Sequence, residues 1–187
     1  MGDAEFLAEV VMGALGEDLC IGLAGDVNRV HLVKELFVSL ASRPDSQYSY
    51  KNAFIVSDED GKPLAGIIAY DGARLCELRR AFFEEANRFL GGTVSVKEAD
   101  AWDDEADKDE IYIDSLFVIP DARKKSLASF LLEAVESKFI DSGKPLGLLV
   151  ETENDRARLV YEHWGFRKVG ISDFFKAPMI HMQKALR

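Results

Sequence analysis

The chain has 187 residues, of which 48% are hydrophobic and 10% aromatic, and its formal net charge is −10. This length and composition predict a single domain over residues 1–187 with one well-filled core. No apolar run approaches the roughly 20 residues of a membrane span, and the N-terminus lacks a secretory signal pattern. We therefore expect a cytoplasmic protein without a membrane partner.

The negative charge is concentrated in one stretch. Residues 98–110 contain eight acidic residues and one lysine. Nucleic-acid binding requires basic surface, so this charge balance argues against a nucleic-acid partner. The two cysteines, Cys20 and Cys76, are expected to be core thiols rather than a disulfide or metal pair. The three histidines, His31, His163 and His181, are scattered, and no metal site is expected.

Helical spacing of apolar residues predicts two helices in the first third of the chain. The first begins at Asp3 as its N-cap. Its apolar positions are Phe6, Leu7, Val10, Val11 and Ala14, and those of the second are Val30, Val33, Leu36, Phe37 and Leu40. Two apolar runs on either side of Asp60-Gly61 then predict a β-hairpin with its turn at residues 57–63.

The second half of the chain alternates predicted helices and strands. A helix over 75–90 ends at Gly91-Gly92. The segment IYIDSLFVIP predicts a strand stopped by Pro120. The following helix has its apolar face at Leu127, Phe130, Leu131, Ala134, Val135 and Phe139. A short strand GLLVE, a helix over about 154–164 and strands at 166–171 and 179–184 complete the order, which predicts a mixed α/β sheet covered by helices.

The segment DARKKSLASFLLEAV (residues 121–135) leads from a strand into a helix and begins with a run of cations. The first backbone amides of a helix lack partners, and the helix dipole adds partial positive charge there. Such a turn is suited to an anion, especially with Arg123, Lys124 and Lys125 around it. A basic helix start on a solvated surface explains the same residues equally well.

The segment LFVIPDARKKSLASFLL resembles the coenzyme-A signature of the GCN5-related N-acetyltransferase (GNAT) superfamily. In that signature a strand ending in Val and Pro leads through Gln/Arg-x-x-Gly-x-Gly/Ala into a helix. Arg123 takes the first signature position, Ser126 the first glycine position and Ala128 the last. A second family segment is visible as NDRARLVYEHWGF. The resemblance covers most of the chain and implies an α/β (α+β) fold whose mixed, mostly antiparallel central sheet is splayed at the cofactor site and flanked by helices.

This resemblance also implies acetyl-CoA as cosubstrate, with pantetheine along the central strand and the pyrophosphate on the signature loop. The implied contacts are the backbone of Leu116, Phe117 and Val118, the phosphate-binding residues Arg123, Lys124, Lys125, Ser126, Leu127 and Ala128, and Asn154. Ser126 departs from the usual glycine. Its Cβ narrows the backbone choices and the clearance for a phosphate, although its hydroxyl can donate a hydrogen bond.

Two residues are candidates for proton transfer. By resemblance, Tyr161 protonates the leaving thiolate, whereas an aromatic core residue beside Trp164 is the structural alternative. Asp114 is the nearest carboxylate on the central strand able to take a proton from an amine, directly or through water, but it is equally able to pair with a basic side chain. Asn154 contacts pantetheine or substrate, or else caps its helix.

Three further residues complete the predicted site. Glu110 and Tyr112 are weaker candidates for the base. The backbone N–H of Val118 is the best placed to meet the oxyanion.

The expected activity is transfer of an acetyl group from acetyl-CoA to a primary amine of a small molecule or peptide. Direct attack in a ternary complex is favoured because no nucleophilic Ser or Cys constellation is present. The alternative is a catalytically silent acyl-CoA-binding or protein-interaction module of the same fold.

Two segments depart from the simplest family pattern. Residues 74–110, a helix followed by the acidic stretch with Trp102, look like an insertion that lines the acceptor pocket or mediates a homodimer contact. The acidic stretch suits a cationic amine, whereas Arg74, Arg79 and Arg80 suit a carboxylate. The first family strand is missing before the first helix, so either it is absent or another segment or chain covers that sheet edge.

Overall fold

The computed structural model describes residues 2–91, 105–174 and 177–186. Its helices and strands follow one another as α1 (Asp3–Leu15), α2 (Glu17–Ala24), α3 (Val30–Ser42), β1 (Ala53–Ser57), β2 (Pro63–Asp71), α4 (Leu75–Leu90), β3 (Ile111–Val118), α5 (Leu127–Phe139), β4 (Leu146–Glu151), α6 (Asp155–His163), β5 (Arg167–Phe174) and β6 (Ala177–Lys184). Within the described ranges, no helix combines the length and apolarity that crossing a bilayer requires.

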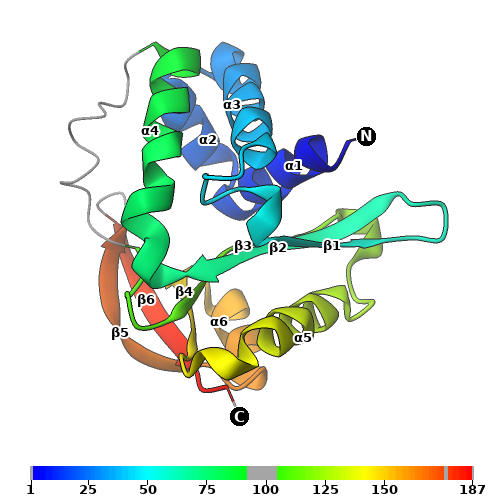
Figure 1. The fold of residues 1–187 in the computed structure, drawn as a ribbon, viewed down its shortest axis with the longest axis vertical. Coiled ribbons are helices and arrows are strands. Elements are labelled where there is room, and N and C mark those ends of the chain that lie inside the picture. Colours follow the sequence, from blue (N-terminus) through cyan, green and yellow to red (C-terminus); the bar gives the residue numbers. More distant parts are fainter. Residues whose placement is uncertain (1, 92–104, 175–176, 187) are drawn as a thin grey trace.

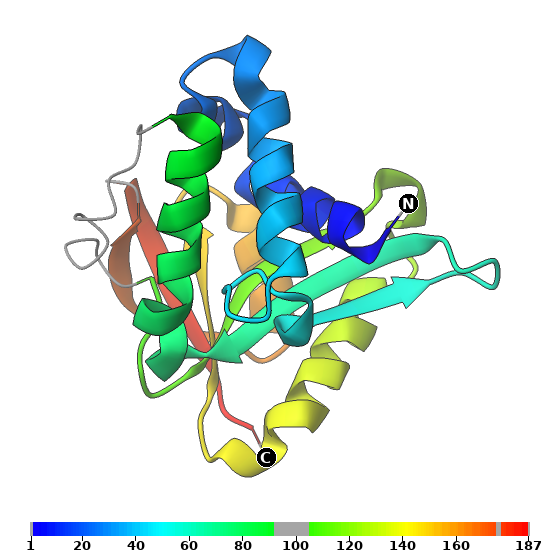
Figure 2. The same ribbon diagram turned by 45° about the horizontal axis from the view of Figure 1, so that its top comes forward.

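The six strands form one sheet in the order β1-β2-β3-β4-β6-β5. Every neighbouring pair is antiparallel except β3 and β4, which are parallel. Helices α1 to α4 cover one face of the sheet and helices α5 and α6 cover the other (Figures 1 and 2). The predicted mixed, mostly antiparallel sheet flanked by helices is confirmed.

The apolar core lies in two layers, one on each face of the sheet. Strand β2 shows why, because its successive side chains point to opposite faces. Ile68 and Tyr70 pack with the helices α1, α3 and α4, whereas Ile67 and Ala69 pack in the second layer with α5. A strand covered on both faces has apolar residues at consecutive positions, as PLAGIIAY does.

Several sequence predictions need correction. Helix α2 was not predicted, because the glycines that flank it, Gly16 and Gly25, are typical of turns. Both glycines have positive φ and mark the two ends of the helix. Gly2, not Asp3, is the N-cap of α1. Phe130 is 63% exposed rather than part of the apolar face of α5. Cys20 is buried as expected, but Cys76 is exposed because it lies on the outer side of α4.

Candidate functional site

The parallel strands β3 and β4 separate soon after they begin, which forms a fork in the sheet. They pair only at Ile111–Leu146 and Tyr112–Gly147. Because parallel strands end at the same edge of a sheet, the helices that follow them, α5 and α6, both begin near the open end of the fork. Two helix N-termini at this edge give it partial positive charge.

Backbone groups of β3 line one side of the fork. The amide of Ile119 donates to the carbonyl of Leu64 (3.0 Å). In an antiparallel ladder every second residue bonds to the same neighbour, so Phe117 also turns its amide and carbonyl toward β2. Leu116 and Val118 therefore turn theirs toward the fork, where Arg123 Nε donates to the Val118 carbonyl (3.3 Å).

The loop between β3 and α5 presents a run of free amides. Among the described residues, the amides of residues 124–129 have no protein acceptor. Lys124 (φ 63°) and Ser126 (φ 57°) both adopt the left-handed conformation. That conformation favours glycine, which explains why the signature has a glycine at the position of Ser126. The exposed side chains of residues 123–126 leave this cationic turn open to an anionic ligand.

Asp114 lies in a β-bulge at the fork. Ile68 is opposite Ser115 and Ala69 is opposite Ile113, so Asp114 is the extra residue without a partner on β2. A bulge re-aims a side chain and bends its strand. Here the Asp114 carboxylate contacts Tyr70 on the α1–α4 side of the sheet. Asp114 is two residues beyond Tyr112, the last residue of β3 that pairs with β4.

The Asp114 carboxylate is held by three hydrogen bonds. The Tyr70 hydroxyl (2.8 Å) and Gln47 Nε2 (3.3 Å) donate to Oδ2, and the Ser115 hydroxyl donates to Oδ1 (2.9 Å). Burial raises the pKa of Asp114 above its ordinary value, although the three hydrogen bonds act in the opposite direction. A carboxylate with a raised pKa is suited to accept a proton near neutral pH.

Tyr161 and Asn154 belong to the opposite side of the sheet. The Tyr161 ring packs edge-on against Trp164 (5.7 Å between centroids) and Phe166 (5.8 Å). Burial raises the pKa of Tyr161, so the phenol keeps its proton at neutral pH, as a general acid must. Asn154 precedes α6 and caps it, its Oδ1 accepting from the Ala157 amide (3.0 Å). Whether either residue takes part in the reaction stays a prediction.

The weaker candidates for the base, Glu110 and Tyr112, are both buried. Glu110 is fully buried and accepts hydrogen bonds from His181 Nε2 (2.7 Å), Gln183 Nε2 (2.8 Å) and the Asp107 amide (2.9 Å). Tyr112 is buried, and burial raises its pKa well above the ordinary value. In the part of the chain that the structure describes, no three His, Cys, Asp or Glu side chains gather as metal ligands.

Sequence reasoning missed a pocket on the α1–α4 side. It is lined by Leu15, Leu23, Phe37, Gln47, Tyr48, Arg79, Phe82, Glu105 and Phe174. Gln47 connects this pocket to Asp114. Nothing in the segment SRPDSQYSY signals such a role, because it has neither strand nor helix periodicity. Trp102 and most of the acidic stretch fall outside the described residues, and Glu105 is its one described member in the pocket.

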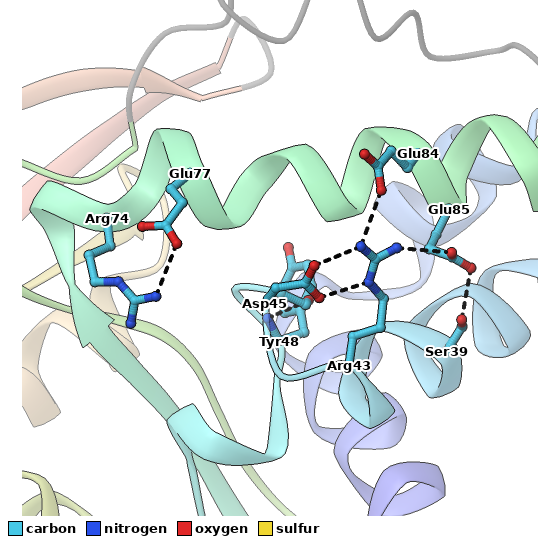
Figure 3. Close-up of polar contacts among 9 residues, drawn as sticks. Ser39, Arg43, Asp45, Tyr48, Arg74, Glu77, Glu84 and Glu85 are labelled. Atoms are coloured by element: carbon cyan, nitrogen blue, oxygen red, sulfur yellow. Dashed lines mark hydrogen bonds and ion pairs between the residues drawn. The ribbon is translucent and has the colours of Figure 1, made fainter.

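The segment carrying Gln47 is anchored to α4 by Arg43 (Figure 3). Arg43 makes two hydrogen bonds to Asp45 (both 2.9 Å) and one each to Glu84 (3.1 Å) and Glu85 (3.2 Å). Ser39 of α3 donates to the other Glu85 oxygen (2.8 Å). Helices α3 and α4 thus hold the segment from both sides, which fixes the pocket wall.

One family model and several solved structures are similar to this chain. The family model described as "Acetyltransferase (GNAT) family" matches residues 31–166. A crystal structure described only as an acetyltransferase shares 21% identity and a TM-score of 0.72, covering 99% of this chain and 95% of its own. An N-acetyltransferase from Staphylococcus aureus Mu50 shares 18% identity and a TM-score of 0.75, covering 97% and 94%.

A third solved structure extends the likeness over the whole chain. It is described as histone acetyltransferase HPA2 and related acetyltransferase from Corynebacterium glutamicum, with 14% identity and a TM-score of 0.64, covering 100% of this chain and 94% of its own. At these identities the likeness concerns the fold. No curated protein is significantly similar in sequence. Since the family model spans well over half of the residues, the chain belongs to the GNAT acetyltransferase family.

Proposed function

We propose that the chain is an N-acetyltransferase that moves the acetyl group of acetyl-CoA to a primary amine of a small molecule or peptide. The observation that carries this proposal is the fork between β3 and β4, which is bordered by free backbone groups, free loop amides and the half-buried Asp114 carboxylate. An extended pantetheine arm pairs well with a strand edge, and a pyrophosphate with helix-start amides.

In this proposal, different residues bind different parts of acetyl-CoA. Leu116 and Val118 offer backbone groups to the pantetheine arm, and the amides of residues 124–129 offer donors to the phosphates, with Arg123, Lys124 and Lys125 adding charge. The Val118 N–H donates a hydrogen bond to the thioester carbonyl oxygen as that oxygen becomes negative. Asn154 has its side-chain nitrogen left for pantetheine while its oxygen caps α6.

Asp114 and Tyr161 move the protons. An ammonium gives one proton to Asp114, and its nitrogen then attacks the thioester carbonyl carbon. The C–S bond breaks as the amide forms, and the thiolate takes the Tyr161 proton. The nitrogen loses its second proton to solvent during this collapse, Asp114 then releases its proton to solvent, and Tyr161 regains one from solvent. The products are the N-acetyl amine and CoA thiol, with one net proton released.

Replacing Tyr161 tests this proposal. Tyr161→Phe keeps the ring that packs on Trp164 and Phe166 but removes the acidic proton. We expect kcat to fall about 10²-fold or more, as general acids contribute 10²–10⁴-fold, with acetyl-CoA affinity unchanged by calorimetry. Thiol release in the presence of a panel of primary amines measures kcat.

Two outcomes would contradict the proposal in different ways. Unchanged turnover in Tyr161→Phe removes Tyr161 from the mechanism. A wild-type protein that binds acetyl-CoA yet releases no thiol above background hydrolysis with any amine is the silent acyl-CoA-binding module instead. Failure to bind acetyl-CoA at all would overturn both.

A further inference from the structure

Gln47 is a buried residue with one half of its amide satisfied. It is 3% exposed, and its Nε2 donates to Glu105 Oε1 (3.2 Å) and Asp114 Oδ2 (3.3 Å). Only the nitrogen of an amide donates, so two carboxylates on one side fix which way the group faces. Oε1 is thereby turned away from them, and it has no hydrogen-bond partner among the described residues.

The segment that carries Gln47 is firmly held, so a loose backbone does not explain why Oε1 has no partner. The carbonyls of Ser46 and Gln47 both accept from Asn52 Nδ2 (3.1 and 3.0 Å), and the Tyr48 amide donates to the Ser46 hydroxyl (3.0 Å). Arg43 ties the same segment to α4 (Figure 3). A buried acceptor without a donor costs about 1–3 kcal/mol. A fixed and unsatisfied acceptor in a pocket is therefore a place for a ligand's donor.

The walls of the pocket favour a cation on a slim stem. Tyr48 packs edge-on against Phe37 (5.1 Å between centroids) and Phe82 (6.3 Å), and all three line the pocket. The cavity volume is about 20 Å³, which is the room of one or two water molecules. Aromatic faces and carboxylates attract an ammonium, whereas so small a volume leaves no room for a ring or a branched carbon beside the ammonium.

The charges around the pocket are mixed. Asp114 and Glu105 face Gln47, and Arg79 of α4 is the described cation in the lining. Asp114 lies nearest the fork, since it is the bulge residue of β3. An ammonium is therefore drawn toward the end of the pocket where the thioester would lie.

We propose that Gln47 selects the acceptor: its N–H groups fix the carboxylates of Asp114 and Glu105, and its Oε1 accepts an N–H from a primary ammonium on an unbranched alkyl stem. This inference rests on the proposed function. Gln47 is thus a positioning and specificity-determining residue, while Asp114 takes the proton. The end of an alkylamine or of a lysine-like side chain fits this description, and branched or aromatic amines do not.

Two substitutions of Gln47 test the inference. Gln47→Met keeps the length and removes both hydrogen-bonding groups, and Gln47→Asn keeps an amide that falls one methylene short. With n-pentylamine as probe, we expect both variants to raise the KM for the amine about tenfold or more, while the KM for acetyl-CoA stays within twofold. Wild type should prefer n-pentylamine over tert-butylamine and benzylamine by at least tenfold in kcat/KM.

Direct binding separates this inference from the proposed function. Calorimetry with n-pentylammonium on the CoA complex should give heat for wild type and a tenfold weaker affinity for Gln47→Asn. If wild type binds the probe but forms no product, the transferase proposal fails and the site stands. The inference is overturned if n-pentylammonium does not bind to wild type, if Gln47→Asn binds it equally well, or if branched amines are equally good acceptors.

Ser39→Ala is the matched control for a purely structural effect. It removes a hydrogen bond to Glu85 in the anchor of the same segment, and Ser39 is not among the residues that line the pocket. We expect a lower melting temperature with an unchanged KM for n-pentylamine. An equal rise of KM in Ser39→Ala and Gln47→Met would overturn the inference, because it would show that Gln47 acts only by stiffening the wall.

Discussion

Ser126 combines a strained backbone with a position in the predicted phosphate-binding loop. Its φ of 57° and ψ of 16° are left-handed values, which cost a residue with a Cβ about 1–2 kcal/mol. Glycine avoids this cost but loses more entropy on folding. Ser126→Gly is therefore expected to raise the free energy of unfolding by up to about 1 kcal/mol, measured by urea denaturation.

The same substitution reports on the ligand. Without the Cβ, a phosphate approaches the loop amides more closely, so the Kd for CoA measured by calorimetry should stay equal or fall. Ser126→Ala is the control, because it removes the hydroxyl and keeps the Cβ, and it should gain no stability. A weaker affinity for CoA in Ser126→Gly would mean that the hydroxyl itself holds the phosphate.

Single residues of the site differ in how well the sequence predicts them. Asp114 was identifiable because a carboxylate in the apolar strand IYIDSLFV demands an explanation, and its burial confirms that the environment is unusual. The bulge that aims it depends on pairing with β2, which no local pattern encodes. Gln47 was not identifiable, because its importance comes from contacts with residues 58 and 67 positions away.

At the scale of elements, the close approach of α1 to β3 depends on Gly13. A Cβ added there would lie 2.3 Å from the Phe117 ring. Gly13→Ala should therefore lower the free energy of unfolding by about 1–3 kcal/mol, the usual cost of overpacking. It should also weaken acetyl-CoA binding, because Phe117 lies between Leu116 and Val118 on the strand that borders the fork.

Gly22 in α2 provides the matched control for this prediction. It is also a helical glycine, but a Cβ there would meet nothing within 4 Å. Gly22→Ala should raise the free energy of unfolding by roughly 0.5–1 kcal/mol, since alanine is the better helix former. Chemical denaturation of both variants makes the comparison, and equal effects of the two substitutions would contradict the packing argument.

The elements that the sequence predicted well are those with long periodic patterns. Helix α4 begins and ends at the predicted residues, and the hairpin turn lies where Asp60-Gly61 placed it. Helix α2 was missed because it has only eight residues between two glycines. The two C-terminal strands are longer than predicted, since their pairing with each other extends past the apolar residues that suggested them.

For the molecule as a whole, the sequence predicted the layered fold but not what closes the fork. The buried Glu110 carboxylate, just before β3, accepts hydrogen bonds from His181 and Gln183 of β6. It also lies against Gly147 of β4, at the end of the fork where β3 and β4 still pair. A Cβ at residue 147 would lie within the Glu110 carboxylate. Four residues from three distant segments form this contact, and no single segment predicts it.

The ion pair between His181 and Glu110 makes the stability of the whole molecule depend on pH. The hydrogen bond to Glu110 raises the pKa of His181 above its ordinary value of 6.5, although burial opposes the change. A raised folded-state pKa means that the native state binds a proton more tightly than the unfolded state. The stabilisation is therefore complete below pH 6.5 and is lost as the pH rises through the folded-state pKa.

His181→Gln isolates this contribution, because glutamine can still donate to Glu110 but does not titrate. Urea denaturation between pH 6 and pH 9 should show wild type more stable than the variant at pH 6, with the difference shrinking as the pH rises. The raised pKa of Asp114 affects both proteins equally and cancels in that difference. A difference independent of pH would mean that His181 supports the closed end of the fork as a neutral hydrogen-bond donor.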